Sequence, residues 1–156
     1  MFKKSIFCCL LILLPIIARS QVNYSGNVFA NVGVRSDQFI SIGAITEHGF
    51  TYNNFFLGIG TGVSDFTSGD EVIEKINIPL FCSIKYHFLN DGRLMPYVAI
   101  KDGICFETYD DHIAKLFDVS IGVELSNHLL IQASSSRQRS QSNELYDFRV
   151  GIGYCF

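Results

Sequence analysis

Apolar residues alternate with polar or small residues along most of this chain. Between Lys115 and Ser126 every odd position after the first is apolar: Phe117, Val119, Ile121, Val123 and Leu125. The same period of two runs through 75–88 and 145–156. Because successive side chains of a β-strand point to opposite faces, this period indicates strands with one apolar and one polar face. The pattern predicts an all-β fold.

The spacing of these runs predicts eight strands, at about 24–35, 39–52, 55–65, 74–88, 96–107, 115–126, 129–138 and 144–156. The connections near 53–54, 90–92 and 127–128 have the Asn, Asp and Gly content of tight turns, whereas 66–73, 108–114 and 139–143 are longer and polar. Short turns at one end and longer loops at the other are typical of barrels that cross a membrane. We predict an eight-stranded antiparallel up-and-down transmembrane β-barrel.

The amino terminus has the features of a secretory leader. Lys3 and Lys4 precede an apolar run of 12 residues at 6–17, and Ala18-Arg19-Ser20 fits a cleavage site with small residues. The run is too short for a transmembrane helix, which needs about 20 apolar residues. We expect residues 1–20 to be a cleaved signal peptide and residues 21–156 to form the barrel domain.

Charge and cysteine content exclude several classes of function. Without the three basic residues of the leader, 9 basic and 15 acidic side chains remain, a net charge of about −6 that disfavours nucleic acid as a partner. Cys82, Cys105 and Cys155 are widely spaced, and the four histidines are scattered. No disulfide framework, metal site or cofactor is expected from this spacing.

Glycines indicate which face of the strands points inward. Ten of the 13 glycines lie on the polar parity: Gly33, Gly43, Gly49, Gly58, Gly60, Gly62, Gly103, Gly122, Gly151 and Gly153. Inside a narrow eight-stranded barrel such glycines make room for large neighbours. We therefore expect a polar interior and an apolar wall facing lipid. A soluble periplasmic or secreted barrel with an apolar ligand inside remains the alternative.

The inward parity also carries charges of both signs: Arg35, Glu47, Lys75, Lys85, Lys101, Asp118, Glu124, Asp147 and Arg149. Ionisable groups within a membrane must pair or reach water. Because side chains alone nearly fill an eight-stranded interior, these charges and the inward Phe29, Phe56 and Phe81 predict a static plug, with a narrow ion-conducting channel as the alternative. Arg149 and Lys101 are the expected cationic centres, with Glu47, Asp118 and Glu124 as partners.

Some charges fall on the parity that should face lipid, among them Asp102, Arg137 and Arg139. Asp102 requires either a β-bulge near Lys101 or a position above the membrane. Arg137 and Arg139 continue the outward parity of the seventh strand. They could contact lipopolysaccharide phosphates or lie at a solvated strand end.

The leader, the segments Ile78-Pro79-Leu80 and Pro96-Tyr97-Val98, and the terminal run Val150-Gly-Ile-Gly-Tyr-Cys-Phe156 together resemble a known family. The chain is similar to the small eight-stranded outer-membrane β-barrels of Gram-negative bacteria, the porin-like outer membrane β-barrel domain proteins. The resemblance implies an outer-membrane location, outer-membrane lipid as a partner, a monomer, and Phe156 with Tyr154 as the signal read by the barrel-assembly machinery.

The resemblance carries little information about activity. Lipid A deacylases share this barrel class, but their His-x-Ser signature is absent, because the four histidines are followed two positions later by Phe50, Leu89, Ala114 and Leu130. We therefore expect a non-catalytic barrel with a structural or interaction role.

Overall fold

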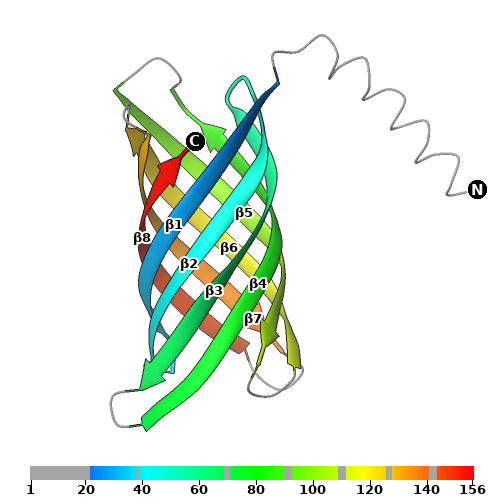
Figure 1. Cartoon of the computed structure of the whole chain (residues 1–156), viewed down its shortest axis with the longest axis vertical. Helices are drawn as coiled ribbons and strands as arrows, with labels where there is room; N and C mark the ends of the chain where they lie inside the picture. The colour runs from blue at the N-terminus through cyan, green and yellow to red at the C-terminus, as the bar shows by residue number, and fades with distance from the viewer. Residues whose placement is uncertain are drawn as a thin grey trace, which may run out of the picture.

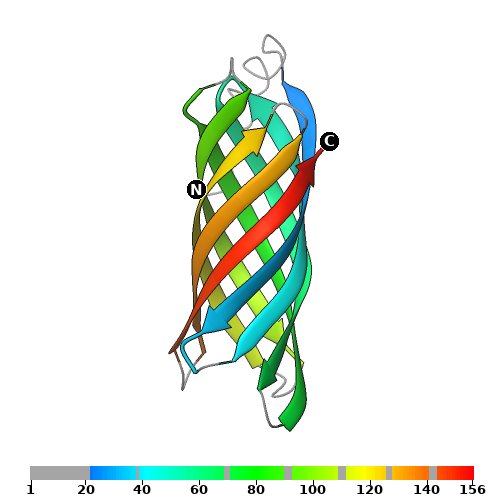
Figure 2. The ribbon, with the colours of Figure 1, turned by 90° about the vertical axis from the view of Figure 1, so that its left-hand side faces the viewer.

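The chain folds into a closed barrel of eight antiparallel strands, in a computed structural model that describes residues 22–37, 39–68, 71–89, 93–108, 112–125, 128–140 and 144–156. The strands are β1 (Asn23–Arg35), β2 (Ile40–Tyr52), β3 (Phe55–Ser68), β4 (Glu71–His87), β5 (Leu94–Glu107), β6 (His112–Leu125), β7 (Leu129–Arg139) and β8 (Glu144–Cys155). Each strand pairs with its neighbours in sequence, and all are tilted around the barrel axis (Figures 1 and 2). The predicted fold class is confirmed, while the predicted leader lies outside the described residues.

Pairing between β1 and β8 closes the barrel. Their register runs from Asn27 opposite Cys155 to Arg35 opposite Asp147. Beyond it, Gly26 and Phe156 exchange two backbone hydrogen bonds of 2.8 Å each. Closure removes the unpaired strand edges that would otherwise attract another chain. No helix in the described part of the chain is long and apolar enough to cross a membrane.

The connections differ between the two ends of the barrel. We call the turn end the one that holds the carboxyl terminus and the connections β2–β3, β4–β5 and β6–β7, and the loop end the opposite one (Figure 1). Asn53 and His128 adopt positive φ angles of 51° and 67° in two connections of the turn end, which tight turns require. One sequence prediction is wrong here: residues 66–73 are mostly strand, because β3 extends to Ser68 and β4 begins at Glu71.

The two faces of the wall have opposite character. Apolar side chains project outward along every strand, with Ile59 63% and Phe148 67% exposed. Aromatic rings such as those of Tyr52, Phe55 and Phe117 are also exposed on the outer face. Many polar and charged side chains point inward and are buried, among them Glu47, Lys101 and Asp118. The predicted orientation is thus confirmed.

Several glycines on the inner face lie where interior rings approach the wall. A Cβ at Gly122 would come within 2.5 Å of the Tyr97 ring and 2.6 Å of the backbone oxygen of Ile131. A Cβ at Gly58 would lie 2.6 Å from the Phe56 ring. Four of the ten inward glycines, Gly58, Gly60, Gly122 and Gly153, therefore make room for interior aromatic rings.

Candidate functional site: the charged interior of the barrel

A fully buried carboxylate occupies the middle of the barrel. Glu47 of β2 is 0% exposed, and its Oε1 lies 2.7 Å from Nζ of Lys101 on β5. Nζ of Lys85 on β4 lies 3.9 Å from the other oxygen, Oε2. The alternation of the strands directs all three side chains inward, and the register across β2–β5 brings them together. One carboxylate thus holds two ammonium groups that are themselves buried.

Aromatic rings complete the surroundings of the two ammonium groups. Nζ of Lys85 lies 4.7 Å from the ring centroid of Tyr97 and 5.2 Å from that of Phe56. Nζ of Lys101 lies 5.4 Å from the ring of Phe81. Ring faces attract cations at these distances. Two ammonium groups share the single negative charge of Glu47, and the faces of the rings help to stabilise the remaining positive charge.

A second ion-pair group lies on the loop side of the first. Arg149 of β8 donates to Oδ2 of Asp118 at 2.9 Å and lies 3.3 Å from a carboxylate oxygen of Asp147. Ser120 donates to Asp118 at 2.8 Å, and Ser41 donates to Asp147 at 3.2 Å. Both carboxylates therefore have a hydroxyl donor as well as the guanidinium.

Arg35 pairs with Asp37 at the loop end. Nε and one terminal nitrogen of Arg35 donate to the two carboxylate oxygens of Asp37 at 2.8 and 2.6 Å. Burial raises the pKa of Asp37, but the hydrogen bonds and positive charge of Arg35 outweigh it and hold the pKa below the ordinary value of 3.8. This bidentate pair fixes the start of the β1–β2 connection.

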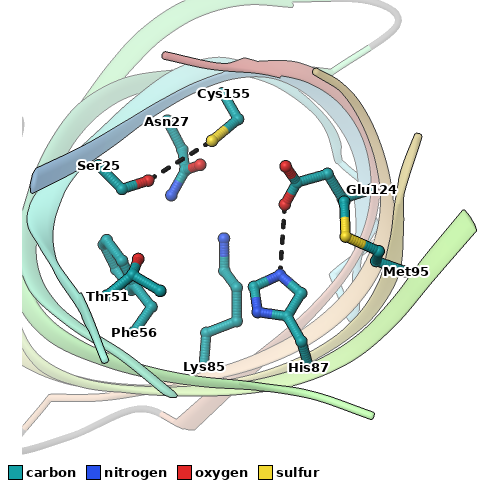
Figure 3. A pocket seen from close by; sticks show the side chains of 9 residues that line it. All are labelled: Ser25, Asn27, Thr51, Phe56, Lys85, His87, Met95, Glu124 and Cys155. Atoms are coloured by element: carbon teal, nitrogen blue, oxygen red, sulfur yellow. Dashed lines mark hydrogen bonds and ion pairs between the residues drawn. The ribbon is translucent and has the colours of Figure 1, made fainter. Parts of the chain in front are cut away.

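At the turn end, Nε2 of His87 lies 3.3 Å from Oε2 of Glu124. These two side chains border a cavity of about 160 Å³ that is also lined by Lys85 and Cys155 (Figure 3). Figure 3 shows the side chains converging on this space from opposite sides of the wall. The turn end therefore has the room that the middle of the barrel lacks.

The middle of the barrel has balanced charge and little free space. Three buried cations face three buried anions: Lys85, Lys101 and Arg149 against Glu47, Asp118 and Asp147. The two cavities that border Arg149 measure about 10 Å³ each. A cavity of that size holds about one water molecule. The arrangement can stabilise a filled interior, and it offers ions little room.

Comparison with the sequence-based network gives a mixed result. Both expected cationic centres have a partner from the expected set of anions: Lys101 pairs with Glu47, and Arg149 pairs with Asp118. Glu124 was expected to partner one of these cations but contacts His87 instead. Two members of the network were not predicted from the sequence: Asp37, which pairs with Arg35, and the interior ring of Tyr97. The side chain of Lys75 is outside the described set.

Asp102 faces outward, as its parity predicts. The β-bulge suggested near Lys101 is wrong, because the pairing of β5 with β4 and β6 runs without interruption through this position. Asp102 lies opposite Phe117 of β6, and Phe117 lies opposite Arg137 of β7. The carboxylate thus lies on the same outer face of the wall as the outward arginines. A position above the membrane, the other explanation offered for Asp102, stays a prediction.

The two outward arginines differ in their contacts. Nε of Arg137 is 2.5 Å from Oε1 of Glu144, and the Arg137 side chain is 46% exposed. Arg139 lies opposite Lys115 on one side and Glu144 on the other. A mixed charged patch, which we define as Lys115, Arg137, Arg139 and Glu144, therefore covers the outer face of β6–β8 at the loop end.

Phe156 and Tyr154 lie at the turn end with their rings outward and half exposed. The ring of Phe156 packs edge-on against His48, at a centroid distance of 5.9 Å. Both positions are accessible from outside the barrel, which recognition by an assembly factor requires.

Comparison with known proteins places the fold among membrane barrels. No protein-family model matches the chain, and no curated protein matches it in sequence. The structure is similar to the outer membrane enzyme PagL, with a TM-score of 0.68 and 12% identity over 82% of this chain and 98% of that one. It is also similar to a de novo designed transmembrane β-barrel, with a TM-score of 0.60 and 19% identity over 85% and 95%.

A third similar structure is the N-terminal β-barrel domain of OprF from Pseudomonas aeruginosa. The TM-score is 0.53 and the identity 16%, over 87% of this chain and 100% of that domain. These three likenesses extend over nearly the whole described barrel. The chain has the fold of the small eight-stranded outer-membrane β-barrels.

Proposed function

We propose that this protein is a non-catalytic barrel of the bacterial outer membrane, with a structural or interaction role and an interior closed by its own side chains. The observation that carries the proposal is the distribution of side chains, which is the reverse of that in a soluble protein: charged residues lie inside and apolar residues lie outside. Glu47, Lys101 and Asp118 are at most 3% exposed inside, while large apolar side chains cover the outside. Such an outer surface is stable against lipid and would favour aggregation in water.

The soluble alternative requires the opposite arrangement. A carrier of apolar ligands needs an apolar internal cavity. The cavities described inside this barrel are lined by charged and polar residues such as Lys85, His87 and Arg149. The interior thus disfavours an apolar ligand, and the outer wall disfavours a soluble protein.

A hydroxyl–imidazole contact on the outer wall is a candidate for catalysis. The hydroxyl of Thr46 lies 3.0 Å from Nε2 of His48, and the hydroxyl of Tyr24 lies 2.6 Å from Nδ1. A hydroxyl–imidazole pair could in principle act as nucleophile and base. However, these positions of β1 and β2 lie in a regular antiparallel ladder, where the backbone N–H groups that would stabilise an oxyanion are already paired. The hydrogen-bonded side chains of Tyr24, His48 and Thr46 therefore suit anchoring at the membrane interface better than hydrolysis.

Fractionation of the bacterial envelope tests the proposal. Extraction of the protein from washed envelopes should require detergent, and the protein should sediment with the outer membrane in a density gradient. Release by osmotic shock would contradict the membrane location. Hydrolysis of lipid esters by the purified barrel that is lost in the Thr46→Val variant would contradict the non-catalytic role.

A further inference from the structure

We propose that Glu124, His128 and Cys155 form a binding site for a divalent transition-metal ion, with Zn²⁺ as the best match, at the turn end of the barrel. One ligand atom from each residue is within 4.8 Å of the others. The three residues come from the end of β6, the β6–β7 connection and the end of β8. Glu124 and His128 lie at either end of the β6–β7 connection, and the pairing of β7 with β8 brings Cys155 beside His128.

The backbone holds these three residues in place. The N–H of His128 donates to the carbonyl of Leu125, and the N–H of Cys155 donates to the carbonyl of His128, both at 2.9 Å. With its φ of 67°, His128 occupies the left-handed region that the turn requires. The connection that carries the imidazole is thereby tied directly to the strand that carries the thiol.

The donor set selects the type of ion. Imidazole nitrogen, thiolate sulfur and carboxylate oxygen are ligands of zinc, whereas Ca²⁺ and Mg²⁺ prefer oxygen alone. Zn–S bonds of about 2.3 Å and Zn–N bonds of about 2.0 Å place tetrahedral ligands about 3.5 Å apart. The Glu124 and His128 side chains therefore have to rotate so that the distances between the ligand atoms shorten by about 1 Å.

Neighbouring groups support a metal ion at this position. His87 lies 3.3 Å from Oε2 of Glu124, the kind of outer contact that orients a ligating carboxylate. The cavity of about 160 Å³ borders both Glu124 and Cys155, so a water molecule can take a fourth position (Figure 3). Cys155 has a 3.5 Å contact with Ser25 Oγ, a long one that leaves its sulfur available.

Charge is also compatible with the ion. A divalent ion held by one thiolate and one carboxylate forms a neutral site. It therefore adds no net charge beside Lys85, whose ammonium faces the same cavity and is engaged by Glu47. Because the ion would join β6, the connection after it and β8, binding should stabilise the closed barrel over the unfolded chain.

Titration of the purified, folded barrel in detergent with Co²⁺ tests the site, because Co²⁺ replaces Zn²⁺ and absorbs light. We expect one equivalent to give the sulfur-to-cobalt charge-transfer band and the visible bands of tetrahedral Co²⁺, and Zn²⁺ to abolish both. The Cys155→Ser and His128→Asn variants should lose this spectrum. His128→Asn is the variant that preserves the turn, since Asn tolerates positive φ.

Matched variants separate the site from incidental binding. Cys82→Ser and His48→Gln remove a thiol and an imidazole on the outer wall and should leave the cobalt spectrum unchanged. His87→Gln should weaken Co²⁺ binding about 10-fold, because it removes the orienting contact alone. Zn²⁺ should raise the unfolding midpoint of the wild type and leave that of His128→Asn unchanged. The absence of a charge-transfer band, or its survival in folded Cys155→Ser, would overturn the proposal.

Discussion

Nζ of Lys101 lies 2.7 Å from Oε1 of Glu47 in the middle of the barrel, where neither side chain is more than 4% exposed. Both charges have been removed from water, so each depends on the other for solvation. Since Lys85 shares the same carboxylate, Glu47 is the residue on which the central part of the interior depends. The interior is therefore held by specific pairs, and the charges do not line a water-filled path.

Replacement of Glu47 by glutamine should destabilise the barrel strongly. Glu47→Gln keeps the shape of the side chain but leaves two buried ammonium groups without an anion, which costs about 3–5 kcal/mol. Urea unfolding in lipid vesicles measures this loss. Glu144→Gln breaks the exposed pair with Arg137 and serves as the control, with little change expected because water screens surface pairs. Equal effects of the two substitutions would contradict a central role for Glu47.

Replacement of Gly122 by alanine should disturb the inner wall. The new methyl group would lie 2.5 Å from the Tyr97 ring and 2.6 Å from the Ile131 carbonyl, and that carbonyl belongs to the β-ladder and cannot easily move. Overpacking of this kind costs about 1–3 kcal/mol. Gly26→Ala is the control, because its methyl group would meet the ring of Phe156, which lies at the chain end and can rotate. Unfolding midpoints should fall for Gly122→Ala and much less for Gly26→Ala.

Asp37 should make stability depend on pH in the acidic range. Its pKa in the folded protein lies below the ordinary value of 3.8, owing to Arg35, so the folded state favours the ionised form. The stabilisation is present above 3.8 and is lost as the pH falls through the lowered pKa. Asp37→Asn should therefore be less stable than the wild type near neutrality, and the difference should shrink in acid. A difference that stays constant down to the acid limit of the folded state would contradict this assignment.

Phe156→Ser should reduce assembly in cells but not folding in a test tube. The backbone hydrogen bonds between Gly26 and Phe156 do not involve the ring, so barrel closure survives the substitution. Phe148→Ser, at another exposed outer position, is the matched control. Immunoblots of outer-membrane fractions should show a selective loss for Phe156→Ser. Equal membrane levels of the two variants would argue against a terminal assembly signal.

Much of the fold follows from the sequence because alternation is a local property. The strand around Phe117–Leu125 and the inward positions of Glu47 and Arg149 could be assigned from parity alone. Partner choice could not, because it depends on how far each strand is staggered relative to the next. His87 and Glu124 are far apart in sequence, and the stagger around the barrel decides that they meet. The register of β7 against β8 likewise brings Cys155 beside His128.

Conductance across a planar lipid bilayer tests the closed interior most directly. The refolded wild-type barrel should insert without steady conductance, because the spaces beside Arg149 measure about 10 Å³ each. In the middle of the barrel, moreover, the buried Lys85, Lys101 and Arg149 are balanced by three buried anions. Insertion is verified independently, by protection of the strands from added protease. A large, steady, ohmic conductance from inserted wild-type protein would contradict the account.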